Sequence, residues 1–562
     1  MDVTTRLRKR ATGPLILELD LTDGLADGQP QDPVSALLAM KRTRLLDVLD
    51  GLKRASEDNR VRALVVKVGG SRIGLARVQE LRDAILKFRE SGKLTVAWTE
   101  SFGEFIRGNL PYYLATAFDK IYLQPTGTLG LTGISVEQVF LHDALAKAGV
   151  DFQSAKRYEY KTAADALTET GFTEPARQTA QRLAGSIAEQ VAAGIAEGRG
   201  KTPEEARALL DRGPFLAKQA LDEGLVDALG YRDEVYEDVR KQAGSDASLL
   251  FVGRYQRARA LAELPRRATT TREPHVALIY AHGTIRQGRA TRSPLGGGGG
   301  IGSDTLTAAI RAAVSDERVR SIVLRVSSPG GSAVASDTIW REVVRARAAG
   351  KPVVVSMGDV AASGGYYISM PADVIVTQPG TITGSIGVIM GKPVLAELFG
   401  RVGVSTDAVT EGGSLGTMFS ASRPFSEDEW ARINTWLDAI YTDFTEKVAS
   451  GRRLPLDRVD ELARGRVWTG VDAVANGLAD ETGGLRDALA IARKRGGLPA
   501  SAPARLYPRV SPLDQLRTPE SSETHPAAAR LFDGWGTFSQ LAAAAGLPPA
   551  GPLMLPGLWK IS

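Results

Sequence analysis

The sequence contains no cysteine, and its 562 residues include only four histidines, His142, His275, His282 and His525. Thiol catalysis, thiolate metal sites and disulfide bonds are therefore excluded, because each needs a cysteine sulfur. No HExxH pattern accompanies the histidines, so the sequence does not predict a zinc hydrolase. We expect no metal and no cofactor, and any hydrolytic chemistry must use a base other than a triad histidine.

Long apolar runs are also missing. The first twelve residues are basic, and the short apolar stretch Leu15–Leu17 is followed by Glu18 and Asp20. This segment is too short and too charged for a signal peptide or a membrane span, and no run of 18 apolar residues occurs elsewhere. We therefore expect neither element in this chain, and a cytoplasmic or membrane-associated location. The basic N-terminus could make a weak peripheral contact with an anionic membrane surface.

Charge of one sign is not concentrated anywhere in the chain. The 70 basic residues are interleaved with 65 acidic ones, and the net charge is only +5. This balance does not predict nucleic-acid binding. The 43% of hydrophobic and 24% of charged residues are typical of a folded globular protein. The length predicts two large domains or a few smaller ones.

An internal repeat organises the chain. The segment DNRVRALVVKV at Asp58–Val68 is matched by DERVRSIVLRV at Asp316–Val326, an offset of 316 − 58 = 258. Later landmarks are offset by 254, as Tyr112–Tyr113 and Tyr366–Tyr367 show. Four extra residues therefore lie in the first copy, between Trp98 and Tyr112.

Each copy alternates short β-branched runs with amphipathic stretches. In the second copy we predict a strand at Ser321–Val326, a helix at Ala333–Ala348 and a strand at Pro352–Ser356. This alternation predicts βαβ units and an α/β fold. The predicted parts are a basic segment (1–12), a first repeat (13–261), a linker (262–273), a second repeat (274–497) and a Pro/Ala-rich tail (498–562). Residues 286–302, rich in glycine, are predicted to form a mobile loop, and the aromatic residues of the tail to dock on the body of the protein.

Three glycine- and serine-rich turns follow predicted strands of the second copy: SSPGGSA from Ser327, MGDVAASGGYY from Met357 and TITGSIGV from Thr381. In the first turn, the N–H groups of Gly330 and Gly331 would face open space, which suits a developing oxyanion. Glycine allows the close approach of backbone to substrate that this requires. An isolated Pro-Gly-Gly is, however, more often a plain strand-to-helix turn.

Ser363 and Lys161 are the candidate nucleophile and base. Ser363 lies between small residues at a strand-to-helix junction, where a lone serine is more often a helix N-cap. Lys161, in YEYKTAADAL, could serve as a base if burial lowered its pKa from about 10.4 towards 7–8. Taken alone, it could equally be a lysine on a helix surface.

The combination of Ser-Pro-Gly-Gly, Ala-Ser-Gly-Gly-Tyr-Tyr, Thr-Gly-Ser-Ile-Gly and an earlier Tyr-Lys-Thr-Ala resembles the long, duplicated form of the signal peptide peptidase A (protease IV) family, peptidase family S49. The resemblance covers residues 13–497. It implies a tandem duplication of the fold shared by Clp proteases and crotonases. It also implies a serine endopeptidase whose hydrophobic peptide substrates include signal-peptide remnants, and which assembles as a homo-oligomer, a tetramer in the family.

The same resemblance implies the roles of individual residues. Ser363 matches the nucleophile and Lys161 the general base, while Ser385 matches the hydroxyl that orients the lysine. The N–H groups of Gly330 and Gly364 match the oxyanion hole. Asn109 occupies the nucleophile position in the first repeat, since 363 − 254 = 109, so one active site per chain is expected.

Two alternatives remain open at the level of sequence. A crotonase-like acyl-CoA enzyme would use backbone N–H groups on the same architecture and would need neither Ser363 nor Lys161. An inactive scaffold of the same fold would have lost its dyad, although both residues are retained here. The N-terminal membrane anchor usual in the long form is not recognisable in this sequence, and the tail beyond Gly497 lies outside the family pattern.

Overall fold

The computed structural model describes residues 13–28, 43–69, 73–104, 106–262, 273–290, 300–412, 414–508, 553–554 and 560–561. The predicted basic N-terminus, nearly all of the linker, most of the glycine run of the predicted mobile loop and the tail aromatics Phe532, Trp535, Phe538 and Trp559 lie outside these ranges. The chain forms two compact units. Met1–Ser135 and Ala184–Glu273 belong to the first, and Val136–Leu183 and Pro274–Ile561 belong to the second.

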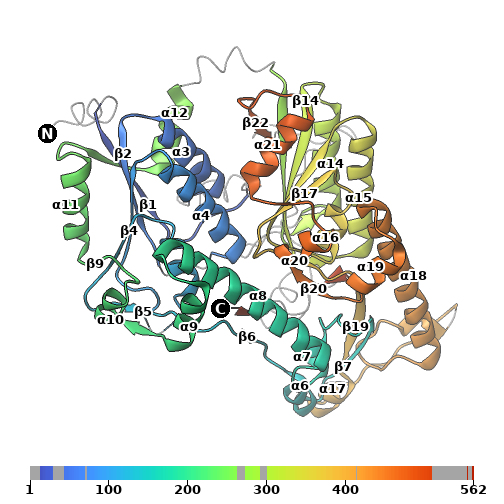
Figure 1. The fold of residues 1–562 in the computed structure, drawn as a ribbon. Helices are drawn as coiled ribbons and strands as arrows, with labels where there is room; N and C mark the ends of the chain where they lie inside the picture. The colour runs from blue at the N-terminus through green and yellow to red at the C-terminus, as the bar shows by residue number, and fades with distance from the viewer. Residues whose placement is uncertain are drawn as a thin grey trace. The chain divides into compact units, whose positions relative to one another are not determined.

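The first unit is built on a parallel six-stranded sheet (Figure 1). Helix α11 (Arg232–Ala243) covers one face, where Val235 and Val239 pack on apolar residues of β1, β2 and β3. Helices α3 (Leu45–Glu57) and α4 (Leu75–Arg89) lie on the opposite side of the sheet in Figure 1. The strands, in spatial order, are β10 (Ser248–Phe251), β1 (Leu15–Asp20), β2 (Val61–Lys67), β3 (Leu94–Thr99), β4 (Lys120–Leu123) and β9 (Ala228–Leu229).

The second unit contains an eight-stranded sheet that is parallel except for the pairing of β18 with β20. Its central strands carry long apolar runs, as expected for a sheet covered on both faces. Six of the strands, in spatial order, are β20 (Val467–Thr469), β18 (Ile382–Gly384), β16 (Val353–Ala362), β14 (Val319–Ser328), β11 (His275–His282) and β22 (Ala504–Leu506). The other two form a branch, in which β17 (Val374–Thr377) pairs with β16 and β21 (Glu481–Thr482) pairs with β17.

Helices surround both sheets. The other helices of the first unit are α5 (Asn109–Ala115), α9 (Pro203–Arg212), α10 (Ala217–Asp222) and α12 (Val252–Ala262). Those of the second unit are α6 (His142–Ala148), α7 (Asp165–Thr168), α14 (Ser303–Ser315), α15 (Ala333–Ala348), α16 (Gly364–Ser369), α17 (Ala396–Arg401), α18 (Glu427–Arg452), α19 (Leu456–Leu462), α20 (Gly470–Ala475) and α21 (Leu485–Arg495). Helix α8 (Glu174–Arg199) begins in the residues of the second unit and ends in those of the first. Within the described ranges, no helix is long and apolar enough to cross a membrane.

The predicted α/β class is confirmed, and the predicted elements of the second repeat are observed. The predicted helix is α15, with the same bounds, and the first predicted strand is β14, which is longer at both ends. The second, predicted at Pro352–Ser356, is β16 and continues to Ala362. The extension matters because it carries the chain directly to Ser363.

The repeat is visible in side-chain contacts as well as in strands. Asp119 in the first repeat accepts a hydrogen bond from Thr95 N at 2.9 Å, and Asp373 in the second accepts one from Val353 N at 2.8 Å. Each aspartate also pairs with an arginine of the helix that precedes the bonded strand, Asp119 with Arg89 of α4 at 2.8 Å and Asp373 with Arg347 of α15 at 2.9 Å. Equivalent residues therefore tie equivalent strands to helices in both copies.

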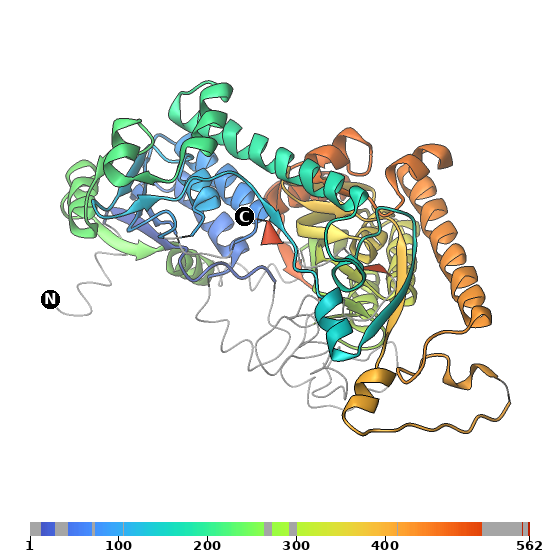
Figure 2. The same cartoon turned by 90° about the horizontal axis from the view of Figure 1, so that it is seen from below.

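Residues 136–183 pack with the second unit, although they belong to the first repeat by sequence. The cause is β7 (Asp151–Arg157), which forms a seven-residue antiparallel ladder with β19 (Val388–Val394). Helix α18, the long orange helix of Figure 2, contacts both strands, and it starts at a Ser426 capping box. The boundaries of the two compact units thus differ from the boundaries of the two sequence repeats.

The chain beyond Gly497 contributes three short strands to the second unit. The first is β22, which pairs with β11 at the edge of the main sheet. The second, β23 (Leu553–Met554), pairs with β15 (Gly330–Gly331), and the third, β24 (Lys560–Ile561), pairs with β6 (Val136–Glu137). Two other short strands, β12 (Ile285–Arg286) and β13 (Ile301–Gly302), extend the small sheet that contains β15.

Candidate active site

Three of the predicted site residues meet in the interior of the second unit. Lys161 Nζ lies 2.9 Å from Ser363 Oγ, 3.0 Å from Ser385 Oγ and 3.0 Å from the backbone oxygen of Ser385. All three residues are fully buried. The sequence separation between Lys161 and Ser363 is 202 residues, so only the tertiary fold brings them together.

The two serines are placed by neighbouring parallel strands. Ala362 at the end of β16 is the register partner of Gly384 at the end of β18, and Ser363 and Ser385 directly follow them. Ser363 N donates to Gly384 O at 2.8 Å, which holds the two strand ends together. Because parallel strands end at the same edge of a sheet, both hydroxyls project from one place.

Both serines have unusual backbone conformations. Ser363 has φ of 55° and Ser385 has φ of 51°, in the left-handed region that side chains other than glycine rarely adopt. Such strain costs about 1–3 kcal/mol per residue and persists only where the surroundings enforce it. Here it turns the Ser363 hydroxyl away from the strand at the start of α16.

Lys161 is placed by the ladder between β7 and β19. Arg157, the last residue of β7, is the register partner of Val388, the first residue of β19. Lys161 follows Arg157 by four residues, and Gly384, the last residue of β18, precedes Val388 by four residues. Continuing the antiparallel direction beyond the ladder therefore brings Lys161 beside the end of β18. A β-carbon at Gly465 would lie 2.4 Å from Lys161 N, so the loop that follows α19 packs directly against the backbone of the lysine.

The surroundings of Lys161 favour its neutral form. Its side chain is completely buried, and no charged group contacts Nζ among the described residues. Burial alone therefore holds the pKa of Lys161 well below its usual range, because desolvation penalises the ammonium. A neutral amine has two N–H donors and one lone pair, which matches the three oxygen atoms around Nζ.

The predicted oxyanion residues lie next to this group. A β-carbon at Gly364, the residue after Ser363, would lie 3.1 Å from both Gly330 Cα and Gly331 N, so only glycine permits the observed approach. The N–H of Gly364 lies in the first turn of α16, where helix geometry leaves it without an intrahelical acceptor. Gly330 N donates to Ser328 Oγ at 3.2 Å.

The histidines lie elsewhere. His275 contacts the Tyr507 hydroxyl at 3.0 Å and His142 contacts Asp143, while His282 ends β11 and stacks edge-on with Tyr280. His525 lies outside the described residues. No group of three or more metal-ligating side chains occurs in the described part of the chain. Lys161 is thus the basic side chain in contact with Ser363.

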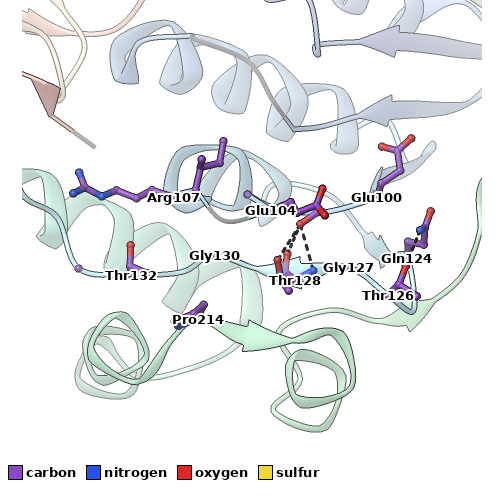
Figure 3. A pocket seen from close by; sticks show the side chains of 14 residues that line it. Glu100, Glu104, Arg107, Gln124, Thr126, Gly127, Thr128, Gly130, Thr132 and Pro214 are labelled. Atoms are coloured by element: carbon purple, nitrogen blue, oxygen red, sulfur yellow. Dashed lines mark hydrogen bonds between the residues drawn. The ribbon is translucent and has the colours of Figure 1, made fainter.

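The first unit contains a pocket of about 740 Å³ at the position that corresponds to this site (Figure 3). It extends from Glu100 and Gln124 at one end to Arg107 and Thr132 at the other. Asn109, the counterpart of Ser363, is buried and accepts a hydrogen bond at 2.9 Å from the backbone N–H of Thr132, a residue that lines the pocket. The described residues that line this pocket include no lysine. The pocket therefore lacks the pair of groups found in the second unit.

Sequence reasoning missed the loop that supports the lysine. Arg464 pairs with Glu159 at 3.0 Å, Arg464 O accepts from Tyr160 N at 3.2 Å, and Arg466 O accepts from Ser385 N at 2.6 Å. The loop thus links the lysine segment to Ser385. Its Arg-Gly-Arg sequence has no distinctive signature beyond one glycine, and the tight turn is visible only in the structure, where Arg464 and Gly465 have φ of 56° and 87°.

Known proteins are similar to this chain in both of its sequence repeats. The model of "Peptidase family S49" matches residues 87–246 and 345–498, one segment in each repeat and again offset by 345 − 87 = 258. The chain is 31% identical over 466 residues to "Serine protease SPPA, chloroplastic" of Arabidopsis thaliana, covering 82% of this chain and 67% of the relative. It is 32% identical over 460 residues to "Protease 4" of Salmonella typhi, covering 80% and 72%. A solved ClpP1 of Listeria monocytogenes aligns with 40% of this chain and 99% of its own, at 15% identity and a TM-score of 0.24. The two family matches confirm the predicted duplication.

Proposed function

Because the chain belongs to peptidase family S49 and is a serine peptidase, we propose that Ser363 is its nucleophile and Lys161 its general base. The observation that carries this proposal is the 2.9 Å contact between Lys161 Nζ and Ser363 Oγ in a fully buried, uncharged setting. A serine hydroxyl is a weak nucleophile until a neighbouring base takes its proton. Ser385 orients that base, because both its hydroxyl and its backbone oxygen contact Nζ.

The reaction follows from this arrangement. As Ser363 Oγ attacks the carbonyl carbon of a peptide bond, its proton moves to Lys161 Nζ. The N–H groups of Gly364 and Gly330 stabilise the oxyanion, and Gly330 exchanges its bond to the Ser328 hydroxyl for this one. The lysine then protonates the leaving amine, and an acyl-enzyme remains on Ser363. Water attacks this ester with Lys161 again as base, which releases the carboxylic acid and restores both residues.

The family membership favours a peptidase over the acyl-CoA alternative, and activity measurements separate a peptidase from a scaffold. We further propose hydrophobic peptides, including signal-peptide remnants, as substrates, on the basis of the family resemblance. A homo-oligomer, a tetramer by the same resemblance, is supported by the exposed stacked pair Phe419 and Trp436, which are 58% and 47% exposed. Light scattering on the purified chain tests the oligomer.

The decisive experiment is the substitution Ser363→Ala. We expect peptide hydrolysis to fall by at least about 10⁴-fold with no loss of folding, because the change removes one oxygen atom and the acyl-enzyme. A serine-directed phosphonylating reagent should add one label per wild-type chain, at Ser363, and none to the variant. Turnover by the folded variant, or a label at another serine, would refute the assignment.

A further inference from the structure

The edge of β15 is where an extended peptide would lie for cleavage at Ser363. This strand consists of Gly330 and Gly331, both buried, and one of its sides is occupied by β12 through the partnership of Gly331 with Ile285. The other side faces away from β12, and the backbone of Gly330 and Gly331 lies close to Gly364, the residue after Ser363. An unpaired strand edge presents backbone N–H and C=O groups that bind a peptide as an added strand.

That edge is occupied by the chain itself. Strand β23 pairs antiparallel with β15, with Met554 opposite Gly330 and Leu553 opposite Gly331. The same strand also lies beside β19, which begins three residues after Ser385. The segment Leu553–Met554 therefore lies beside both the glycine strand and the strand that begins three residues after Ser385.

A second pairing anchors the same end of the chain. Strand β24 pairs antiparallel with β6, with Lys560 opposite Glu137 and Ile561 opposite Val136. In sequence, Leu553 and Met554 stand between Pro552 and Pro556, and prolines have no N–H to donate. The paired strand is thereby confined to a few residues, and the chain is paired again six residues after Met554.

Ser363 is buried in this arrangement, with no accessible surface, as is Lys161. A nucleophile must contact its substrate, so a peptide can react only after something leaves the site. Resting on the proposed function of Ser363, we infer that the segment Leu553–Met554 is a built-in ligand of the substrate groove, and that peptide substrates bind by displacing it from the edge of β15. The C-terminus of this chain is then a competitive inhibitor of its own active site.

The expected strength follows from tethering. A segment attached to the same chain has an effective concentration of about 1 mM, so even a segment with an affinity of about 0.1 mM would raise the apparent KM about tenfold. Because displacement precedes chemistry, kcat should be unaffected. Substrates that pair strongly as extended strands would compete best, which makes the tail a filter against weakly bound peptides.

The test compares the full chain with a chain that ends at Gly551. On a short fluorogenic peptide, the shortened chain should show a KM about tenfold lower and an unchanged kcat. In the full-length protein, replacing both Leu553 and Met554 with proline should have the same effect, because the strand loses its N–H donors. The matched control exchanges the two side chains, Leu553→Met with Met554→Leu, keeps the N–H groups and should leave KM unchanged.

A synthetic peptide of residues 551–562 provides the complementary measurement. It should inhibit the shortened chain competitively and the full chain much more weakly. An unchanged KM after shortening, together with no inhibition by the peptide, would overturn the inference. Binding of a labelled peptide to the shortened chain carrying Ser363→Ala, followed by fluorescence anisotropy, needs no catalysis. The labelled peptide should bind if the edge of β15 is the substrate groove, even if Ser363 proved not to be the nucleophile.

Discussion

The side chain of Lys161 is completely buried and has no counter-charge in contact with it, two properties that would each destabilise a protonated lysine. The folded protein tolerates them because the amine is neutral, so its pKa is lowered relative to the unfolded chain. Between the lowered pKa and the ordinary value near 10.4, the unfolded state binds the extra proton, and stability therefore rises with pH across that window. In the proposed mechanism the same proton balance sets catalysis, since only the neutral amine can accept a proton from Ser363.

This requirement makes a prediction for Lys161. We expect Lys161→Arg to be as inactive as Lys161→Ala, at least about 10³-fold below wild type, because a guanidinium remains protonated and cannot act as a base. In wild type, kcat/KM should rise with pH through the lowered pKa of the lysine. A pH–rate profile that is flat from pH 5 to 9, or an active arginine variant, would argue against a titrating lysine.

Ser385 makes a separate residue-scale prediction. Ser385→Ala removes the 3.0 Å hydroxyl contact to Nζ but keeps the backbone oxygen contact, so we expect kcat to fall about 10–100-fold with little change in KM. Thr383→Ala is a matched control, because it deletes a buried hydroxyl on the same strand that bonds Ala361 O rather than the lysine. Equal losses in kcat for the two variants would assign Ser385 a structural role only.

At the scale of elements, the site depends on three segments: the paired ends of β16 and β18, the β7–β19 ladder and the loop between α19 and β20. The strand ends determine where the hydroxyls stand, and the ladder determines where the lysine enters. The loop closes on the lysine backbone, since Gly465 leaves no room for a side chain there. Misplacing any of these segments by about 1 Å is expected to cost about 10²-fold in rate.

Gly465→Ala tests this element. The added β-carbon would lie 2.4 Å from Lys161 N, and the alanine would be strained at φ of 87°, so the lysine segment must shift. We expect kcat to fall about 10²-fold while the protein remains folded. Gly497→Ala is the control, because that glycine also has a left-handed φ, 63°, but open space around the new carbon. Comparable activity in both variants would contradict the proposed support of Lys161 by this loop.

At the scale of the whole molecule, the proposed active site draws on both sequence repeats. The second repeat supplies Ser363 and Ser385, and the first supplies Lys161 through a segment that packs with the second unit. The first unit has Asn109 at the corresponding position and a pocket without lysine among its described lining residues. The serine thus occurs in one repeat and the lysine in the other.

Division of the chain tests this arrangement. A protein that begins at Pro274 retains both serines but lacks β7 and Lys161, and we expect no peptide hydrolysis from it. Co-expression with residues 1–273 should restore activity where the two parts reassociate through the β7–β19 ladder. Circular dichroism establishes that the shorter protein is folded. Hydrolysis by the purified 274–562 part alone would place the base within it, for example at His282 or Lys392.

Much of this protein was predictable from local sequence. Alternation of β-branched runs with amphipathic stretches predicted the α/β class, and α15 was predicted with its observed bounds, because helix and strand formation depend on neighbours a few residues apart. The repeat was visible because both copies keep residues such as Asp119 and Asp373 for the same contacts. The family resemblance then supplied the candidate residues and their roles.

Tertiary structure alone decided the rest. The contact between Lys161 and Ser363 spans 202 residues and depends on the pairing of β7 with β19, whose register no local pattern specifies. The lowered pKa of Lys161 is a consequence of burial, which arises only when distant segments pack around it. Strand β23 has two residues, too few to show a period-two pattern, so its place beside Gly330 follows from packing at the β15 edge rather than from its sequence.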